Sequence, residues 1–494
     1  MRIIRTDQDD ILALPQWDRE QIYNGLDVLI THDVHSAIAP QLDATTSATY
    51  DFSRALQGPV LEMGIRGVLV DQARRLEVIN LFADQIDQIE TRLAKLVRDG
   101  FDLPVFNWRS PRDLAHLFYT VIGIRPIIRQ GRPTVDLGAR EKIATYPVAT
   151  ALISHINVLA DLGKKLSTLQ TEIDPDGRIR TSYNIAGTNT GRFSSSLSEF
   201  GTGGNLQNIE ESLRSIFVAD PGWKFAKCDA KSGESYAVGA IEWNLFGDGT
   251  YLDAVESGDV HTTVARMVWP ELGWTGITGT DKDLAERPYY RGHSYRFMCK
   301  KLGHGSNYGG KPATLAAQSR IESAVVEEFQ DKYFAAFPAH RRWQAAVDDQ
   351  LRRLGYLVSL TGRKRWFFGR RNDPSTLREA IAYDPQCSLA DIVNRTMLSI
   401  WRQRIALIVM HDHDALTFMY REKDEPYVIP KLQEALVVPV PLSQNRVLRI
   451  PYDIETGWNK GHYHPDTNPD GLRPYRGADP RRRQPIRDIL DALT

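Results

Sequence analysis

The alternation of apolar and polar positions predicts both helices and strands in this chain. Between Val70 and Val97 the apolar residues recur at spacings of three and four, which is typical of one face of a long amphipathic helix. "KFAKCDA" (224–230) and the apolar run before His411 predict buried strands, while residues 245–350 and 376–404 are mostly helical in pattern. We therefore expect a mixed α/β (α+β) fold. The positions of the helical stripe are Ile79, Phe82, Ile86, Ile89, Leu93 and Leu96.

Aspartates at the ends of the two predicted strands are candidates for a metal site. One is Asp229; the other strand leads into "HDHD", where either Asp412 or Asp414 could be its partner. Two carboxylates a few ångströms apart cannot both stay ionised without a cation between them. Hard divalent ions such as Mg²⁺ suit them, and a pair of ions about 3.5–4 Å apart can stabilise phosphoryl transfer. From spacing alone, two unrelated surface carboxylates are an alternative.

The segment "YRFMCKKLGHGSNYGG" (295–310) carries a second candidate site. It places two cations and then two rings at steps of four residues, which lie near one face of a helix. Cations suit a triphosphate, and flat rings suit a sugar and base. The alternative is a solvated basic face with aromatic packing at its end. The four residues are Arg296, Lys300, His304 and Tyr308.

Composition narrows the class of protein. The 494 residues are 42% hydrophobic and 25% charged, which is typical of a globular protein with two to four subdomains. A net charge of -1 does not exclude a nucleic-acid binder, because a basic groove can lie within a neutral total. Three distant cysteines argue against disulfides and zinc, and favour a reducing compartment. With no signal peptide or long apolar run visible, we expect no membrane partner and a cytoplasmic location.

Several motifs between about residues 55 and 465 resemble those of family A DNA polymerases. "TGRFSSS" followed by "NLQNI" resembles the segment that cradles the primer–template duplex, and "REAIAYDPQCSLADIV" resembles the palm helix that touches the minor groove. "PYDIETGWNKGHYH" resembles the closing G-x-N-W…H pattern of the family. The resemblance implies DNA contacts for Arg192, Asn205, Gln207, Asn208, Arg378 and Gln386.

The same resemblance implies roles around the reacting nucleotide. "DAKSGE" is similar to the first palm motif, so Asp229 and the Ala230 backbone would be metal ligands and Glu234 a steric gate against a ribose 2′-OH. Arg296, Lys300, His304 and Tyr308 match the fingers helix, and His261 would approach the incoming phosphates. Only "HDALTF" (413–418) fits the third motif, H-D-x-L-x-F, which favours Asp414 as the second ligand and His413 near the primer terminus. Asp412 stays an alternative.

Three positions depart from the pattern of the family. His304 stands where Phe or Tyr is usual, and adds polarity and a group that can titrate near neutral pH. Ala415 replaces an acidic residue, and Ala382 replaces an asparagine. None of these is a predicted metal ligand, so we expect activity with altered accuracy or nucleotide discrimination.

The resemblance implies a right-hand polymerase fold with palm, fingers and thumb. The expected domains are a segment 1–50 resembling the end of a 3′–5′ exonuclease domain or a docking segment, a thumb (51–190), a first palm part (191–245), fingers (246–345), and a second palm part with a basic C-terminal tail (346–494). We expect short helical or turn segments in the first 50 residues, and a poorly ordered end in the stretch rich in Arg and Pro that begins at Arg473.

Proofreading is not expected within this chain. "YNGLD" (23–27) resembles the last exonuclease motif, but no D-x-E precedes it, and "DIE" (453–455) falls in the palm. A two-metal exonuclease needs those carboxylates. A separate exonuclease or a processivity factor is therefore a possible partner, with residues 1–50 as a docking segment.

The predicted function is template-directed addition of dNTPs to a primer 3′-OH by two-metal phosphoryl transfer. The partners are primer–template DNA and dNTPs, and the cofactor is Mg²⁺ (two ions). The alternatives are a repair or lesion-bypass polymerase, a single-subunit RNA polymerase-like enzyme, and a non-catalytic DNA-binding scaffold. A phage replication enzyme, acting in the cytoplasm of a bacterial host, fits the compact form.

Overall fold

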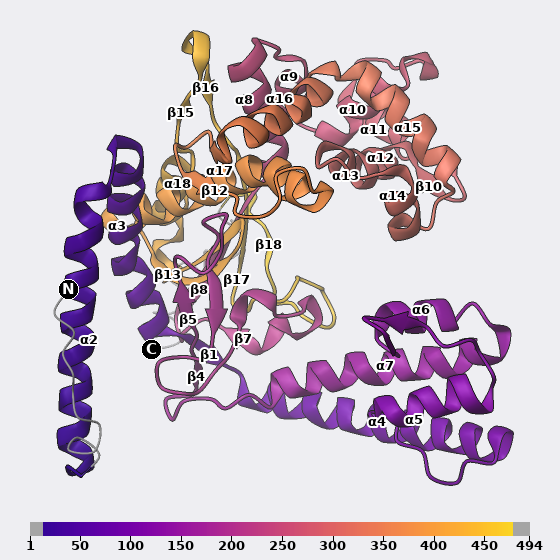
Figure 1. Cartoon of the computed structure of the whole chain (residues 1–494). Coiled ribbons are helices and arrows are strands. Elements are labelled where there is room, and N and C mark those ends of the chain that lie inside the picture. The colour runs from indigo at the N-terminus through magenta and orange to yellow at the C-terminus, as the bar shows by residue number, and fades with distance from the viewer. Residues whose placement is uncertain (1–12, 478–494) are drawn as a thin grey trace, which may run out of the picture.

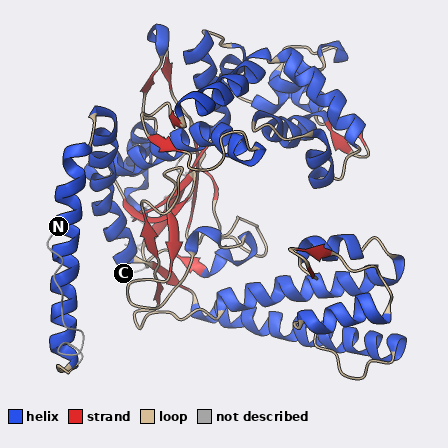
Figure 2. Cartoon of the chain, viewed as in Figure 1, coloured by secondary structure: helices blue, strands red, loops and turns tan. Residues whose placement is uncertain are grey.

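A computed structural model describes residues 13–477, and the chain forms a central sheet with two helical arms (Figures 1 and 2). The sheet has five antiparallel strands in the order β13-β14-β8-β17-β18. No described helix combines the length and apolar character that crossing a membrane requires. The strands are β8 (Trp223–Ala230), β13 (Leu407–Asp412), β14 (Ala415–Arg421), β17 (Tyr452–Gly457) and β18 (Arg473–Pro474).

Side-chain alternation along β8 explains how the sheet is covered on both faces. Cys228 packs with helices of the palm and fingers, while Phe225 belongs to a smaller core at the base of the molecule. Successive residues of a strand point to opposite faces, so the short apolar run supplies both cores. The covering palm helices are α17 (Pro374–Arg402), near the predicted 376–404, and α18 (Glu425–Leu436).

Further palm elements are short strands and turns around this sheet. They are β4 (Arg178–Ile179), β5 (Ser182–Asn184), β6 (Ser194–Ser196), η3 (Leu206–Asn208), η4 (Glu211–Ile216), β7 (Phe217–Val218), β11 (Tyr356–Val358), β12 (Lys364–Trp366), η7 (Glu422–Asp424), β15 (Val440–Pro441), η8 (Ser443–Asn445) and β16 (Val447–Leu448).

One helical arm, the predicted thumb, has its own hydrophobic core between two long helices. The predicted amphipathic helix is α4, whose buried residues are Ile86, Leu93 and Val97. Leu96, predicted to close the stripe, is instead 44% exposed, because the 3.6-residue period brings Val97 onto the buried face. The arm comprises α4 (Gln72–Phe101), α5 (Pro111–Ala115), η2 (His116–Val121), β2 (Ile128–Arg129), β3 (Arg132–Pro133), α6 (Leu137–Ile143) and α7 (Pro147–Leu169). The strand before α4, β1 (Val68–Val70), pairs with β4 and β7 at the base of the palm.

The second arm, the predicted fingers, is mostly helical as expected. Its largest buried side chains include Trp269, Tyr333 and Phe337. Its elements are α8 (Gly233–Phe246), α9 (Thr250–Glu256), α10 (Val260–Val268), η5 (Pro270–Leu272), α11 (Thr278–Ala285), β9 (Pro288–Tyr290), β10 (His293–Ser294), α12 (Tyr295–Met298), η6 (Cys299–Gly303), α13 (His304–Asn307), α14 (Pro312–Ser319), α15 (Ser323–Ala336) and α16 (Pro338–Leu354).

The N-terminal region differs from the prediction of short helical or turn segments. Residues Gln16–Ile38 form one helix of 23 residues, α2, none of which is buried (Figure 1). After η1 (Ala39–Gln41), α3 (Ala44–Arg66) packs against β13 and α17. Leu56, Val60 and Met63 of α3 join the palm–fingers core, so this helix, predicted as the start of the thumb, belongs structurally to the palm.

The C-terminal tail was predicted as a poorly ordered basic segment beginning near Arg473. Arg473–Pro474 instead form β18, which pairs with β17. In this pairing Pro474 lies opposite Glu455, and Arg473 lies opposite Thr456. The rest of the basic tail, from residue 478 onward, lies outside the described residues, as do residues 1–12 of the N-terminal segment.

Candidate active site

The hairpin of β13 and β14 brings Asp414 beside Asp229. In the register, Ala415 lies opposite Asp229, and the Ala230 N–H donates to the Asp414 carbonyl at 3.0 Å. Burial, and then the charge of Asp414, raises the pKa of Asp229 to about 6, although its side chain is 44% exposed. A second carboxylate close enough to oppose ionisation is the arrangement that a bound cation relieves.

Asp412 has a different partner. Its Oδ2 lies 2.5 Å from Nζ of Lys460, and the two side chains are 13% and 2% exposed. Lys460 also lies 3.2 Å from the Met410 sulfur, on the strand face that Met410 and Asp412 share. Burial lowers the pKa of Lys460, while the carboxylate beside it opposes that shift. Asp412 is thus ion-paired away from Asp229, and Lys460 stands where the G-x-N-W pattern has tryptophan.

The two histidines of the "HDHD" run have different environments. His411 is buried, with Nε2 at 2.9 Å from Asn394 Oδ1 and its ring 4.5 Å from that of Phe193. His413 is at φ 59°, a left-handed conformation that is uncommon for a side chain-bearing residue. Its half-buried ring has no hydrogen-bond partner for Nδ1 among the described residues. His411 therefore anchors the hairpin, and His413 forms its turn.

Glu234, in the first turn of α8, contacts side chains from two separate segments. Its carboxylate accepts a hydrogen bond from Arg192 at 2.5 Å and another from the Tyr308 hydroxyl. His304 Nε2 lies 3.7 Å away, and the His304 and Tyr308 rings meet edge to face at 5.0 Å. Burial and the Glu234 charge raise the pKa of Tyr308. Arg192, predicted to contact DNA, is thus bound to the predicted sugar gate.

The prediction from residues at steps of four assumed a regular α-helix. The fingers helix is not regular. A π turn at Cys299–Gly303 separates α12 from α13. In an α-helix, a side chain four residues further on is rotated by about 40° beyond one full turn. A π turn contains more residues per turn, so it reduces this rotation. Arg296 is paired with Asp259 at 3.2 Å and with Glu286 at 3.4 Å, whereas Lys300 is exposed.

His261 lies in the first turn of α10 beside this basic face. Burial, and then the charge of Arg296, lowers the pKa of His261 to about 4; Asp259 opposes the shift, and Lys300 adds to it. A histidine with this pKa is neutral near pH 7 and can take part in hydrogen bonds without adding charge.

Apart from Arg192 and His413, the residues predicted to hold the duplex make contacts of their own elsewhere in the palm. Asn205 caps η3, accepting from the Ser195 hydroxyl at 2.7 Å and from the Gln207 N–H at 3.1 Å. Gln207 is 6% exposed, its Nε2 has no partner in the part of the chain described, and η3 contacts β13. Asn208 is exposed, as is Arg378 on α17, where Gln386 is half-buried.

The donor set at the paired aspartates fits hard divalent cations. It offers two carboxylates and the backbone oxygen of Ala230, all oxygen donors. Within residues 13–477, no group of three or more His, Cys, Asp or Glu side chains is arranged to hold a metal ion. Lys227, which was not among the predicted site residues, lies 3.8 Å from Asp229 and 3.3 Å from Glu455. Its position two residues before Asp229 on one strand was the available signal.

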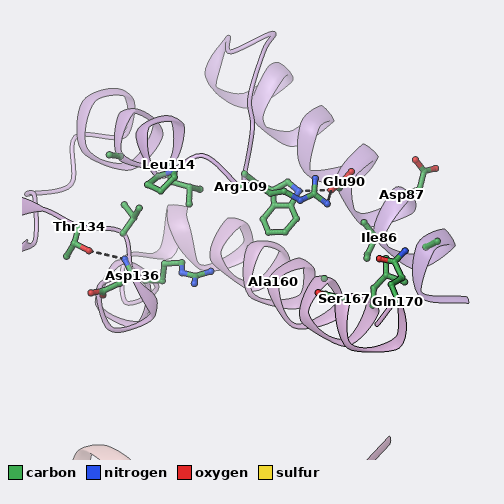
Figure 3. A pocket seen from close by; sticks show the side chains of 18 of the residues that line it. Ile86, Asp87, Glu90, Arg109, Leu114, Thr134, Asp136, Ala160, Ser167 and Gln170 are labelled. Carbon is green, nitrogen blue, oxygen red and sulfur yellow. Dashed lines mark hydrogen bonds and ion pairs between the residues drawn. The ribbon is translucent and has the colours of Figure 1, made fainter. Parts of the chain in front are cut away.

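A spacious hollow lies in the thumb, away from the paired aspartates. It is a groove of about 930 Å³ between α4, α5, α6 and α7 (Figure 3). Glu90 on its wall already binds Arg109 at 2.8 Å and the Trp108 indole N–H at 2.7 Å. Glu90 is therefore already bonded to other residues of the thumb. The groove contains no described pair of carboxylates on adjacent strands like Asp229 and Asp414.

Comparison with known proteins establishes the class of protein. Residues 74–463 match the model for DNA polymerase family A, and the chain belongs to this family. The fold matches the POL domain of Pol1 from M. smegmatis, solved in complex with DNA primer-template and dNTP, with a TM-score of 0.66 and 22% identity over 82% of this chain and 69% of that one. The expected family and polymerase fold are confirmed. Family A DNA polymerases generally use divalent metal ions.

Individual relatives are bacterial polymerases. DNA polymerase I of Chloroflexus aurantiacus is 26% identical over 403 residues, which are 77% of this chain and 40% of the relative. DNA polymerase I of Pseudomonas aeruginosa is 25% identical over 472 residues, covering 89% and 47%. The thermostable DNA polymerase I of Thermus aquaticus is 22% identical, covering 82% and 47%. The chain thus spans less than half the length of these three relatives.

Proposed function

We propose that this chain is a DNA-directed DNA polymerase that adds dNTPs to a primer 3′-OH under the direction of a template. The observation that carries the proposal is the meeting of Asp229 and Asp414 at one end of the palm sheet, in a chain of DNA polymerase family A. Asp229, Asp414 and the Ala230 backbone would hold two Mg²⁺ ions. Such ions supply positive charge at the attacking and leaving oxygens.

The triphosphate of the nucleotide would bind beside the fingers helix. Lys300 is exposed, and Arg296 carries its charge at the same face, so both can neutralise phosphate oxygens. Arg296 would exchange Asp259 or Glu286 for phosphate, and the guanidinium fork can bind two oxygens at once. His261, neutral at pH 7, would add a hydrogen bond. Phosphoryl transfer gains mainly from this positioning and charge stabilisation.

The sugar would lie against Glu234 and the ring of His304 or Tyr308. Arg192 and Tyr308 both bind the Glu234 carboxylate and so hold it in one place. A fixed carboxylate leaves no room for a ribose 2′-OH, which favours dNTPs and argues against the RNA polymerase alternative. Histidine at position 304 adds a polar edge at this surface, where it can change discrimination among nucleotides.

The duplex would bind through groups that read little sequence. Arg192, Asn205, Gln207, Asn208, Arg378, Gln386 and His413 are the proposed contacts. Arg192 has five N–H donors, so it can keep Glu234 and still reach the DNA. Contacts to the sugar–phosphate backbone release counterions, so we expect binding to weaken steeply as salt rises.

Primer extension with Mg²⁺ tests the proposal and the choice between the two His-Asp pairs. The unmodified chain is compared with Asp229→Asn, Asp414→Asn and Asp412→Asn, with dNTPs and separately with NTPs. We expect dNTP extension that falls at least about 10³-fold in the first two variants, since each removes a charged ligand at the reacting centre. Asp412→Asn should retain extension at a reduced rate, because it weakens only the ion pair to Lys460.

Other outcomes have distinct meanings. Loss of extension in Asp412→Asn but not in Asp414→Asn would shift the motif register by two residues. Preference for NTPs would favour the RNA polymerase alternative. DNA binding without incorporation by the unmodified chain would favour a scaffold.

A separate proofreading partner stays a prediction, and α2 is where it would dock. Tyr23 and Asp27 lie one turn apart on α2, and Tyr23 is 65% exposed. Because no residue of α2 is buried, packing against the rest of this chain adds little to the stability of the helix. The check is to incubate the purified chain with a 3′-mismatched primer and no dNTPs. Shortening of the primer would contradict the expectation that these residues provide no exonuclease.

A further inference from the structure

A chain of buried polar side chains crosses the base of the fingers. Glu242 of α8 and His340 of α16 are both 0% exposed, and the carboxylate is bonded to Nδ1 of the ring. Nε2 of the same ring lies 3.1 Å from the Tyr333 hydroxyl, which donates to Oδ1 of Asn307 at 2.8 Å. The Asn307 amide in turn donates to the Tyr251 hydroxyl at 3.3 Å. Five helices, α8, α9, α13, α15 and α16, thus share one relay.

Both ring nitrogens of His340 have a partner in this relay. Nδ1 is bonded to the Glu242 carboxylate, and Nε2 is bonded to the Tyr333 hydroxyl, whose proton goes to Asn307. The ring therefore bridges α8 and α15.

The relay ends beside the nucleotide site. Asn307 is the last residue of α13, and Tyr308, which binds Glu234, follows it directly. The carbonyls at the end of a helix lack partners within it. Gln344 of α16 donates to the carbonyls of Ser306 and Asn307, both at 3.0 Å, and Gln330 of α15 donates to that of Gly310 at 2.8 Å. Residues 306–310 are therefore held by α15 and α16.

Helix α8 contributes a carboxylate to both ends of this arrangement. Glu234 binds Tyr308 directly, and Glu242, about two turns further along α8, reaches Asn307 through His340 and Tyr333. Two attachments between the same pair of helices fix both the distance and the angle of Tyr308 relative to Glu234.

We propose that Glu242, His340 and Tyr333 are positioning residues that set the place of Tyr308 against Glu234, and so determine selection of the sugar. The inference rests on the proposed polymerase function. A buried polar pair of this kind is often no more stabilising than apolar residues of similar volume, so its benefit here is fixed geometry rather than stability. A hydrogen-bonded polar network has a directionality that apolar packing lacks.

The test compares Tyr333→Phe with the matched control Tyr420→Phe. Both remove one buried hydroxyl, and Tyr420 donates to Glu425 at 2.9 Å at the far end of β14 from Asp414. We expect Tyr333→Phe to raise KM for dNTP and to lower the preference for dNTP over rNTP, each about five- to tenfold. Glu242→Gln, which keeps an acceptor for Nδ1, should lose less. The control should keep both values.

Amide hydrogen exchange gives a second readout that needs no catalysis. Residues 304–310 should exchange faster in Tyr333→Phe and at the unmodified rate in Tyr420→Phe. Unchanged exchange and unchanged selectivity in Tyr333→Phe would overturn the inference and leave a purely structural network. Absence of incorporation by the unmodified chain would instead overturn the proposed function, and exchange would then still decide whether the relay positions this segment.

Discussion

At the scale of single residues, the site is built from carboxylates with different partners. Asp229 and Asp414 face each other, Asp412 is paired with Lys460, and Glu234 is held by Arg192 and Tyr308. Burial and the charge of Asp414 raise the pKa of Asp229 although Lys227 lies 3.8 Å away. Repulsion between native carboxylates costs stability whenever both are ionised, which makes the proposed metal site testable without activity.

Asp229→Asn should stabilise the protein at pH 8 without divalent ions. The folded pKa of about 6 lies above the ordinary 3.8, so losing the proton above pH 6 favours the unfolded chain, whereas below pH 3.8 both states keep it. Because the side chain is 44% exposed, we discount for solvent screening and expect about 1 kcal/mol. Calorimetry at pH 3.5, 6 and 8 measures the gain, which should vanish at the lowest pH.

Mg²⁺ and a surface variant serve as controls for this prediction. Mg²⁺ should raise the Tm of the unmodified chain at pH 8, and much less that of Asp229→Asn, because a ligand that binds only the folded state stabilises it. Glu141→Gln, an exposed change in the thumb, should shift Tm at no pH. An equal gain at pH 3.5 and pH 8 would mean that Asp229→Asn acts through packing rather than charge.

At the scale of elements, one loop after β17 fixes the hairpin of β13 and β14. Lys460 binds Asp412 through its side chain, and its own N–H donates to the Phe217 carbonyl of β7 at 2.9 Å. The turn of β13 and β14 is thereby tied to the base of the palm. A buried ion pair in this place holds a turn in position at some cost in desolvation.

Lys460→Met should destabilise the protein by about 3 kcal/mol, because it leaves Asp412 largely buried without its cation. The double variant Lys460→Met with Asp412→Val should recover most of that loss, since no charge is then left unpaired. Urea unfolding of the single and double variants measures the coupling. If the two changes are additive, the pair contributes nothing as a pair, and the hairpin is held by its strands alone.

At the scale of the whole molecule, residues 13–477 pack around three hydrophobic cores. The thumb core contains residues from Ile86 to Leu162 and shares no buried residue with the core that joins palm and fingers. The third lies at the base, between the sheet and the β4-β1-β7 sheet. Regions with separate hydrophobic cores can unfold locally and independently of each other. We therefore expect the thumb to unfold locally without disturbing the paired aspartates.

Ile156→Ala, in the thumb core on α7, should therefore destabilise the thumb locally. The side chain is 0% exposed, and its truncation costs about 2–4 kcal/mol. Hydrogen exchange should quicken across α4 and α7 and stay unchanged in β8 and β14. Ile429→Ala, equally buried in the palm–fingers core, is the matched change and should affect the palm instead. Faster exchange in β8 after Ile156→Ala would show that the cores unfold together.

Local patterns in the sequence determined the elements and the motifs. The stripe of α4, the apolar run of β8, the long helix α17 and the match of "HDALTF" to the third motif all depend on neighbours a few residues apart. Helix and strand periods act over such distances, so one chain suffices to find them.

Only the tertiary structure decided which side chains meet. Asp412 and Lys460 are 48 residues apart, Arg192 and Glu234 are 42 apart, and Glu242 and His340 are 98 apart. The partner of a charged side chain is set by how the elements pack and not by its own segment of sequence. For this reason the sequence did not decide the role of Asp412, and it predicted only a DNA contact for Arg192. The tertiary structure also decided the place of α3. Its apolar side chains could pack in a thumb or in a palm, and in the structure they join the palm–fingers core.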